Sequence, residues 1–173
     1  MEAPVDVFQE AEMLRKVPFF SGLDSAKLKL LAFTSRAQRF APGEDLMRKG
    51  DPADSAYVIL EGEVEIIGET TAGEFVVAVV GRNELQGEMG VIMNAPRGLT
   101  VRAKTPVRVL RIEGEVFLRL ITENPECALD VMRQLSARVA ASNARLAAAQ
   151  RDLEALRGKA PTAGAATGGG SPA

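Results

Sequence analysis

Residues Gly87 to Val101 read GEMGVIMNAPRGLTV, and no other stretch constrains the fold as strongly. The stretch begins with a Gly-Glu step and predicts a short helix over the apolar residues that follow. Such a helix start exposes unpaired backbone N–H groups, here at Glu88, Met89 and Gly90, which attract an anion together with the helix dipole. We therefore expect an anion site at the beginning of this helix.

A single arginine, Arg97, follows this helix directly behind a proline. Its guanidinium is a planar fork of donors that suits a phosphate. Glu88, beside the anion site, offers an acceptor to a sugar hydroxyl. Donors for a phosphate and an acceptor for a ribose within residues 87–97 predict a nucleotide pocket.

Each of these residues has an alternative interpretation. Glu88 can simply complement the helix N-terminus, which favours acidic residues in its first turn. Gly87 can be an ordinary turn glycine, and Arg97 a surface arginine paired with a carboxylate. Their combination at this spacing, inside a run of short strands, favours the phosphate site.

The stretch resembles the phosphate-binding cassette of cyclic nucleotide-binding domains, in which Gly-Glu and a short apolar helix precede Pro-Arg, then Ser or Thr, then Ala. The resemblance implies that Gly87 and the amides of residues 88–90 hold the phosphate. It also implies that Glu88 binds the ribose 2′-hydroxyl and that Arg97 neutralises the phosphate charge. No metal is expected, since the sequence has no histidine and no His/Cys cluster.

Three positions depart from the family pattern. Gly90 and Leu99 stand where the family usually has alanine, and Gly98 stands where it has the Ser or Thr hydroxyl that helps to hold the phosphate. The missing hydroxyl is expected to weaken binding. Because the family associates a threonine at this position with guanine recognition, cyclic AMP (cAMP) is the expected ligand, and cyclic GMP is disfavoured.

Composition narrows the function further. The 173 residues contain no histidine and one cysteine, which excludes a His-based catalytic triad, a His/Cys metal cluster and an intrachain disulfide. The net charge of −2 provides no basic field for nucleic acid or acidic lipid. No apolar run is long enough to cross a bilayer and the N-terminus lacks a signal peptide, so we expect a cytoplasmic protein. Because the residues for a His-based triad or a metal cluster are missing, we do not expect an enzyme.

The chain divides into four parts by pattern. We expect an N-terminal helix over residues 1–16, a β-roll over 17–124, a long helix over 125–157 and a disordered tail over 158–173. Many short strands separated by turn residues are typical of a β-sandwich or jelly-roll barrel. The predicted fold is therefore mainly β with flanking helices, a cyclic nucleotide-binding jelly roll followed by a long C-terminal helix.

The long helix has apolar positions at alternating spacings of three and four, the signature of a coiled coil that would pair two copies of the chain. Alternatively, the same stripe packs on the barrel as an ordinary amphipathic helix, although about 30 residues span about 45 Å, more than a small barrel requires. The stripe consists of Met132, Leu135, Val139, Ser142, Leu146, Ala149, Leu153 and Leu156.

A second resemblance concerns the base of the nucleotide. Residues 100–105 and Asn124-Pro125 are similar to the bacterial catabolite activator subfamily, and by counting forward Ser142 and Asn143 fall where that subfamily contacts adenine. Ser142 could equally be a polar residue that sets the coiled-coil register. From strand position, Val80, Leu85 and Leu99 are further candidates for the base side.

The sequence thus predicts a stand-alone cyclic nucleotide sensor, a homodimer that repositions its C-terminal helix to alter binding of an unknown protein effector. Because the helix-turn-helix of the catabolite activators is not found, direct DNA binding is not expected. The alternative is a degenerate barrel that binds no nucleotide and serves as a dimeric scaffold, which Gly98 would favour.

Overall fold

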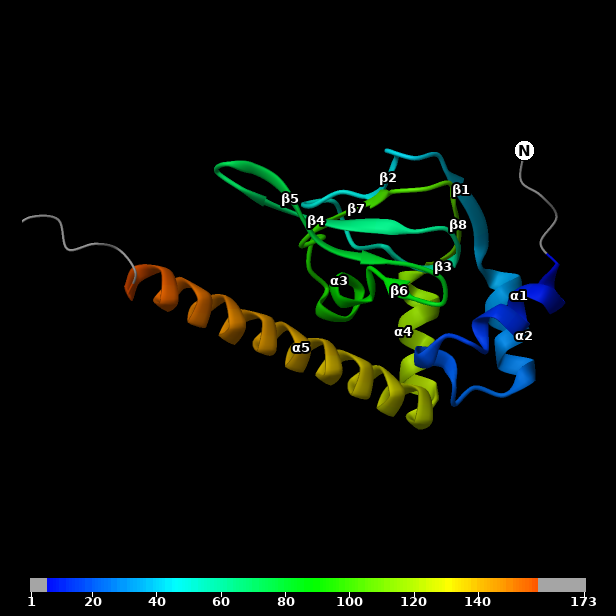
Figure 1. Cartoon of the computed structure of the whole chain (residues 1–173). Coiled ribbons are helices and arrows are strands. Elements are labelled where there is room, and N and C mark those ends of the chain that lie inside the picture. The colour runs from blue at the N-terminus through cyan, green and yellow to red at the C-terminus, as the bar shows by residue number, and fades with distance from the viewer. Residues whose placement is uncertain (1–5, 159–173) are drawn as a thin grey trace, which may run out of the picture. The chain divides into compact units, whose positions relative to one another are not determined.

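The computed structural model, which describes residues 6–158, consists of two antiparallel four-stranded sheets flanked by helices (Figure 1). The strands are β1 Arg36–Phe40, β2 Asp45–Met47, β3 Ser55–Glu61, β4 Val64–Thr70, β5 Gly73–Val80, β6 Leu85–Gln86, β7 Thr100–Ala103 and β8 Val107–Glu113. One sheet has the order β1-β8-β3-β6 and the other β2-β7-β4-β5. Apart from the β4–β5 hairpin, neighbouring strands in each sheet are not consecutive in the chain, and the predicted jelly-roll architecture is confirmed.

The core of the roll lies between the two sheets. In β8, Val107 and Val109 share one face of the strand and belong to this layer, whereas Leu110 and Ile112 are also buried but lie on the opposite face. Burial of apolar area in this layer is the main force that closes the roll. The residues clustered there are Leu46, Met47, Tyr57, Ile59, Val64, Ile66, Val101, Ala103, Val107 and Val109.

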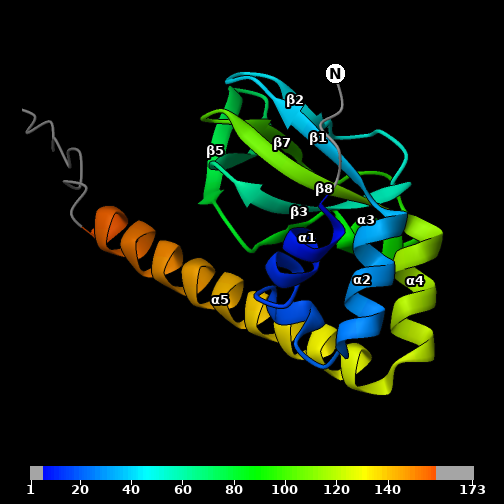
Figure 2. The same ribbon diagram turned by 90° about the vertical axis from the view of Figure 1, so that its right-hand side faces the viewer.

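The helices are α1 Val7–Leu14, α2 Ser25–Thr34, α3 Glu88–Met93, α4 Gly114–Glu123 and α5 Pro125–Gly158, with a 3₁₀ turn, η1, at Pro18–Phe20. Helices α1 and α2 pack on each other, and α2 and α4 contact β8 at the same end of the roll (Figures 1 and 2). Asp24 caps α2, accepting from the Lys27 backbone N–H at 2.9 Å.

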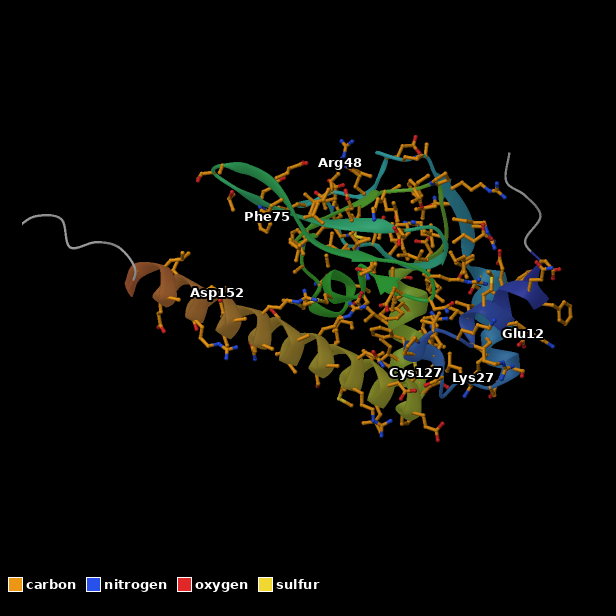
Figure 3. All side chains as sticks on the ribbon, in the orientation of Figure 1. Glu12, Lys27, Arg48, Phe75, Cys127 and Asp152 are labelled. Atoms are coloured by element: carbon orange, nitrogen blue, oxygen red, sulfur yellow. The ribbon has the colours of Figure 1, made fainter. Side chains whose placement is uncertain are left out.

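The described chain divides into two compact units between Gln134 and Leu135, so α5 begins in the first unit and continues in the second. In the first unit, the start of α5 packs on η1 and the turn after it. Cys127, labelled in Figure 3, donates its thiol proton to the Phe19 carbonyl at 3.3 Å, and Ser21 Oγ donates to Asp130 Oδ2 at 2.6 Å. Burial raises the pKa of the Cys127 thiol to about 11, which keeps the thiol protonated as a donor.

The boundaries of the N-terminal and C-terminal parts differ slightly from the prediction. Of the predicted residues 1–16, the described part forms a helix over Val7–Leu14, which Asp6 caps by accepting from the Phe8 and Gln9 N–H groups. Residues 1–5 lie outside the described residues. The long helix reaches Gly158. The rest of the predicted tail, residues 159–173, lies outside the described residues. Among residues 6–158, no helix has the length and apolar character needed to cross a membrane.

Candidate functional site

Helix α3 lies between β6 and β7, where the sequence predicts an anion site. Gly87 is its N-cap residue, in the left-handed region at φ +86°, and as a glycine it makes no side-chain capping hydrogen bond. The N-cap residue therefore does not occupy the N–H groups of the first turn with a side chain of its own. An uncapped helix start with these donors favours an anion there.

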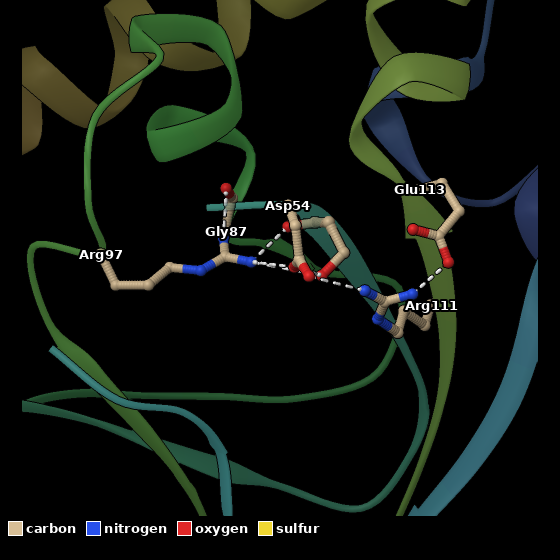
Figure 4. A network of polar contacts seen from close by, with 6 residues as sticks. Asp54, Gly87, Arg97, Arg111 and Glu113 are labelled. Atoms are coloured by element: carbon tan, nitrogen blue, oxygen red, sulfur yellow. Dashed lines mark hydrogen bonds and ion pairs between the residues drawn. The ribbon is translucent and has the colours of Figure 1, made fainter. Parts of the chain in front are cut away.

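Arg97 is the second component of the site, and it is buried. Its side chain is 3% exposed, so the alternative of a surface arginine is wrong, although a carboxylate does pair with it. The guanidinium Nη1 donates to the Gly87 carbonyl at 2.8 Å, and Nη2 donates to the Ser55 carbonyl at 2.6 Å and to Ser55 Oγ at 3.3 Å. Asp54 lies 3.7 Å from Nη2 as an ion pair (Figure 4).

These contacts hold the guanidinium directly beneath the start of α3, because Gly87 is the residue that precedes it. A Cβ atom at position 87 would lie 2.5 Å from Arg97 Nη1. The glycine is therefore required both for its positive φ and for the room it leaves the arginine. The structure brings Gly87 and Arg97 into contact, while their joint binding of a phosphate stays a prediction.

Glu88 opens α3, and the residue is 1% exposed. Its carboxylate is thus enclosed at the helix start rather than displayed to solvent. Met89 is 52% exposed, while Gly90 packs closely: a Cβ at Gly90 would lie 2.6 Å from the Cβ of Ala53. Position 90 has glycine where the family usually has alanine, and here the methyl group of Ala53 lies where an alanine side chain at position 90 would need space.

Gly98 and Leu99 face open space at the far end of the stretch. A Cβ at Gly98 would meet no atom of the described residues within 4 Å, and Leu99 is 40% exposed. A side chain at position 98 would therefore fit without displacing anything. Gly98 lacks the hydroxyl of the family pattern, but a serine or threonine side chain would fit at this position.

The candidate base-side residues lie in three places. Val80 ends β5 and is half-buried, whereas Leu85 in β6 is fully buried opposite Val58. Ser142 and Asn143 are exposed positions of α5 in the second unit. The structure thus groups the phosphate-side residues within one segment, and the assignment of the base-side residues stays a prediction.

Sequence reasoning missed a network of charged residues beside Arg97. Arg111 in β8 donates to Asp54 Oδ2 at 3.1 Å and also pairs with Glu113 (Figure 4). Burial by itself raises the pKa of the Asp54 carboxyl, but the Ser55 hydroxyl and the charges of Arg111 and Arg97 outweigh it and hold that pKa below its usual range. No local signal marks these residues, because they come together only when β3 pairs with β8.

Burial also lowers the pKa of the Arg97 guanidinium, against the raising effect of Tyr57 and Asp54. A buried cation is costly unless it is paired and hydrogen-bonded. Two backbone carbonyls, a hydroxyl and one carboxylate supply those partners. The site is therefore a fixed cation next to an uncapped helix start, an arrangement that suits a phosphate with a single negative charge.

A family model described as "Cyclic nucleotide-binding domain" matches residues 37–124. Among curated proteins, the potassium channel SKOR of Arabidopsis thaliana is 32% identical over 109 residues, which is 62% of this chain and 13% of the channel. The chain thus spans about an eighth of that relative's length.

Solved structures agree with the family match. The sensor domain of the transcriptional regulator DNR from Pseudomonas aeruginosa aligns with a TM-score of 0.70 and 25% identity, over 76% of this chain and 89% of that one. A regulatory subunit of a cAMP-independent protein kinase A from Trypanosoma brucei, a mutant bound to cAMP in its A site, aligns at 0.64 with 28% identity, over 75% and 48%. The corresponding Trypanosoma cruzi subunit, bound to guanosine, aligns at 0.63 with 27% identity, over 75% and 47%.

Proposed function

The chain belongs to the cyclic nucleotide-binding domain family, and from that premise we propose that it is a sensor of cAMP. The observation that carries the proposal is the contact between Arg97 and Gly87, which sets a buried cation beneath the uncapped start of α3. A cyclic phosphate diester has one negative charge and two free oxygens. One oxygen would accept from the first-turn amides of α3 and the other would face Arg97.

Glu88 would complete the site on the sugar side. It is the first residue of α3 and its carboxylate is enclosed next to the phosphate donors, so a ribose 2′-hydroxyl could donate to it when the nucleotide enters. A buried acceptor of this kind discriminates against a ligand that lacks the hydroxyl, because the hydrogen bond from the ligand to the carboxylate would not form. A 2′-deoxy nucleotide is therefore expected to bind much more weakly.

The preference for cAMP over cyclic GMP rests on position 98. The family associates a threonine there with guanine, and this chain has a glycine whose surroundings are open. A second candidate ligand is a nucleoside without phosphate, since the Trypanosoma cruzi neighbour is bound to guanosine. Gly98 favours that candidate too, because it removes one phosphate ligand.

Signalling is assigned to α5. Its first turns contact η1 and the following turn through Cys127–Phe19 and Ser21–Asp130, so a shift of that segment on nucleotide binding would reach the helix. Beyond them, Val139, Leu146 and Leu153 recur at intervals of seven and are exposed in the single chain. A second copy of the chain is the proposed occupant of this stripe, because such heptad spacing is self-complementary in a two-stranded coiled coil.

A nucleotide-dependent change in the affinity of this helix for a second copy, or for a protein effector, would transmit the signal. That coupling requires the nucleotide to bind the two arrangements with different affinity. The family is regulatory rather than catalytic, which supports a sensor over an enzyme. The opposing hypothesis remains a dimeric scaffold that binds no nucleotide.

The test is isothermal titration calorimetry of the whole chain with cAMP, cyclic GMP, 2′-deoxy-cAMP and guanosine. We expect micromolar or tighter binding of cAMP, about −8 kcal/mol or better. Arg97→Ala should remove it, since loss of one partner of a buried charge pair costs about 2–5 kcal/mol. Arg39→Ala removes an exposed arginine of β1 and should bind as the wild type does.

The outcomes separate the hypotheses. Binding of guanosine but not of cAMP would select the nucleoside candidate. No heat and no rise in melting temperature with any of the four ligands would contradict the sensor and leave the scaffold. Because Arg97→Ala also removes structural hydrogen bonds, its melting temperature without ligand must be measured, and Arg97→Lys serves as the variant that retains the charge.

A further inference from the structure

Asp54 lies between two arginines, and it is closer to the one outside the cassette. Its Oδ2 is 3.1 Å from Arg111 Nη2, whereas its Oδ1 is 3.7 Å from Arg97 Nη2, beyond hydrogen-bond distance (Figure 4). The Asp54 side chain is 66% exposed, while those of Arg111 and Arg97 are 16% and 3% exposed. The carboxylate is therefore an exposed group between two enclosed cations.

The fold holds the backbone of Asp54 in place, whereas its carboxylate can pair with either Arg111 or Arg97. The Asp54 carbonyl accepts from the Gly114 N–H at 2.7 Å, which ties it to the start of α4. Arg111 and Glu113 are two residues apart on β8 and so point to the same face of the strand, opposite Tyr57 and Ser55 of β3. Arg111 is thus held by strand pairing at a place where it can reach Asp54.

The charge of Asp54 opposes nucleotide binding in two ways. A carboxylate beside the start of α3 repels a cyclic phosphate, and it competes with that phosphate for Arg97. Both effects diminish when another cation holds the carboxylate. Arg111 is such a cation, and Glu113 pairs with its other terminal nitrogen, Nη1, so that the fork is held from both sides.

We propose that Arg111 is a positioning residue for the nucleotide site: by holding Asp54, it keeps that carboxylate off Arg97 and away from the incoming phosphate. The inference rests on the proposed function and adds a determinant of affinity that lies outside the cassette. It assigns no direct contact between Arg111 and the ligand. The affinity for nucleotide then depends on whether the Asp54 carboxylate pairs with Arg111 or with Arg97.

A double-mutant cycle measures whether the effect of Arg111 on nucleotide affinity depends on Asp54. We expect Arg111→Gln to weaken nucleotide binding about tenfold, or ~1.4 kcal/mol, because Asp54 then turns to Arg97. Asp54→Asn should bind at least as tightly as the wild type, and adding Arg111→Gln to it should change nothing further. Arg111→Lys, which retains the charge, should restore most of the affinity. If Arg111→Gln binds as the wild type does, or weakens binding equally in the Asp54→Asn background, the proposal is wrong.

Arg108→Gln is the matched control. Arg108 lies on the same strand, is similarly enclosed and is also ion-paired, to Glu61 at 3.0 Å and Glu10 at 3.6 Å, but it does not contact Asp54. Its replacement should alter the melting temperature without altering nucleotide affinity. An equal loss of affinity in Arg108→Gln would mean that general disturbance of β8 explains the effect, and would overturn the proposal.

A measurement without ligand separates this inference from the proposed function. The pKa of Asp54 can be followed by carboxyl-carbon NMR in the free protein. We expect it to rise in Arg111→Gln and to stay unchanged in Arg108→Gln; no rise in Arg111→Gln would overturn the assigned pairing. If the pKa rises but the wild type binds no nucleotide in calorimetry, the proposed function fails, and the role of Arg111 in affinity fails with it.

Discussion

Gly87 and Arg97 are ten residues apart in sequence and in direct contact in the fold: Arg97 Nη1 donates to the Gly87 carbonyl at 2.8 Å. The same nitrogen occupies the space that a Cβ at position 87 would need. The left-handed glycine and the buried cation are therefore one structural unit, and each constrains what can replace the other.

Gly87→Ala is expected to abolish nucleotide binding and to lower the free energy of unfolding by about 1–3 kcal/mol, because strained backbone and a displaced guanidinium add together. Gly43→Ala is the matched control, since Gly43 also has a positive φ, +89°, but its Cβ would meet no described atom within 4 Å. Urea denaturation and calorimetry of both variants isolate the contact with Arg97. Equal effects in the two variants would contradict it.

Gly98→Ser is expected to raise cAMP affinity about three- to tenfold, because it restores a phosphate donor at a position with room for it. Gly98→Ala makes the same backbone change without a hydroxyl and should bind as the wild type does. Calorimetric titration compares the three proteins. An equal gain in both variants would assign the effect to backbone stiffening instead.

Gly90→Ala is expected to destabilise the fold by about 1–3 kcal/mol, because its Cβ would lie 2.6 Å from that of Ala53. Ala53→Gly should rescue it, so that the double variant is more stable than Gly90→Ala alone. The melting temperatures of the four proteins in this cycle provide the check. Additive losses would show that the two positions do not compete for space.

Glu10 is expected to make stability depend on pH. Its carboxyl is buried with Oε2 unpaired among the described residues, and burial raises its pKa from the usual 4.5, against the charge of Arg108, while Asp6 raises it further. A carboxyl with a raised folded-state pKa stabilises the fold below its unfolded pKa, and that contribution is lost as the pH rises through the folded pKa.

Glu10→Gln should therefore be more stable than the wild type at pH 7, by about 1 kcal/mol, and the advantage should shrink toward pH 4.5. Urea denaturation at both pH values measures it. Glu12→Gln, at an exposed position of the same helix, should show no such difference. A constant difference across the pH range would contradict the assignment to Glu10 ionisation.

Leu146→Glu is expected to convert a dimer to a monomer in sedimentation equilibrium, because it puts a charge into the proposed seam of α5. Ala144→Glu places the same charge off the stripe and should leave the dimer intact. Monomeric wild-type protein at micromolar concentration would contradict the pairing of α5. The nucleotide site is tested separately, by calorimetry.

Local chemistry made several features predictable. The Gly-Glu step before an apolar run predicted a short helix, and α3 forms there. The spacing from Gly87 to Arg97 predicted a phosphate site; the two residues are in contact, and the binding of phosphate stays a prediction. Such features depend on residues close in sequence, for which turn geometry and helix periodicity are sufficient guides.

The sequence by itself thus determined the succession of N-terminal helix, β-roll and long helix, the cassette segment and the heptad spacing along the long helix. Only the tertiary structure decided that Arg97 turns inward, that Ala53 fills the space beside Gly90, and that Arg111 holds Asp54. The reason is that Ser55 and Arg97 are 42 residues apart and Asp54 and Arg111 are 57 apart. Contacts at such separations follow from strand register, which the pairing of β3 with β8 sets and no local pattern encodes.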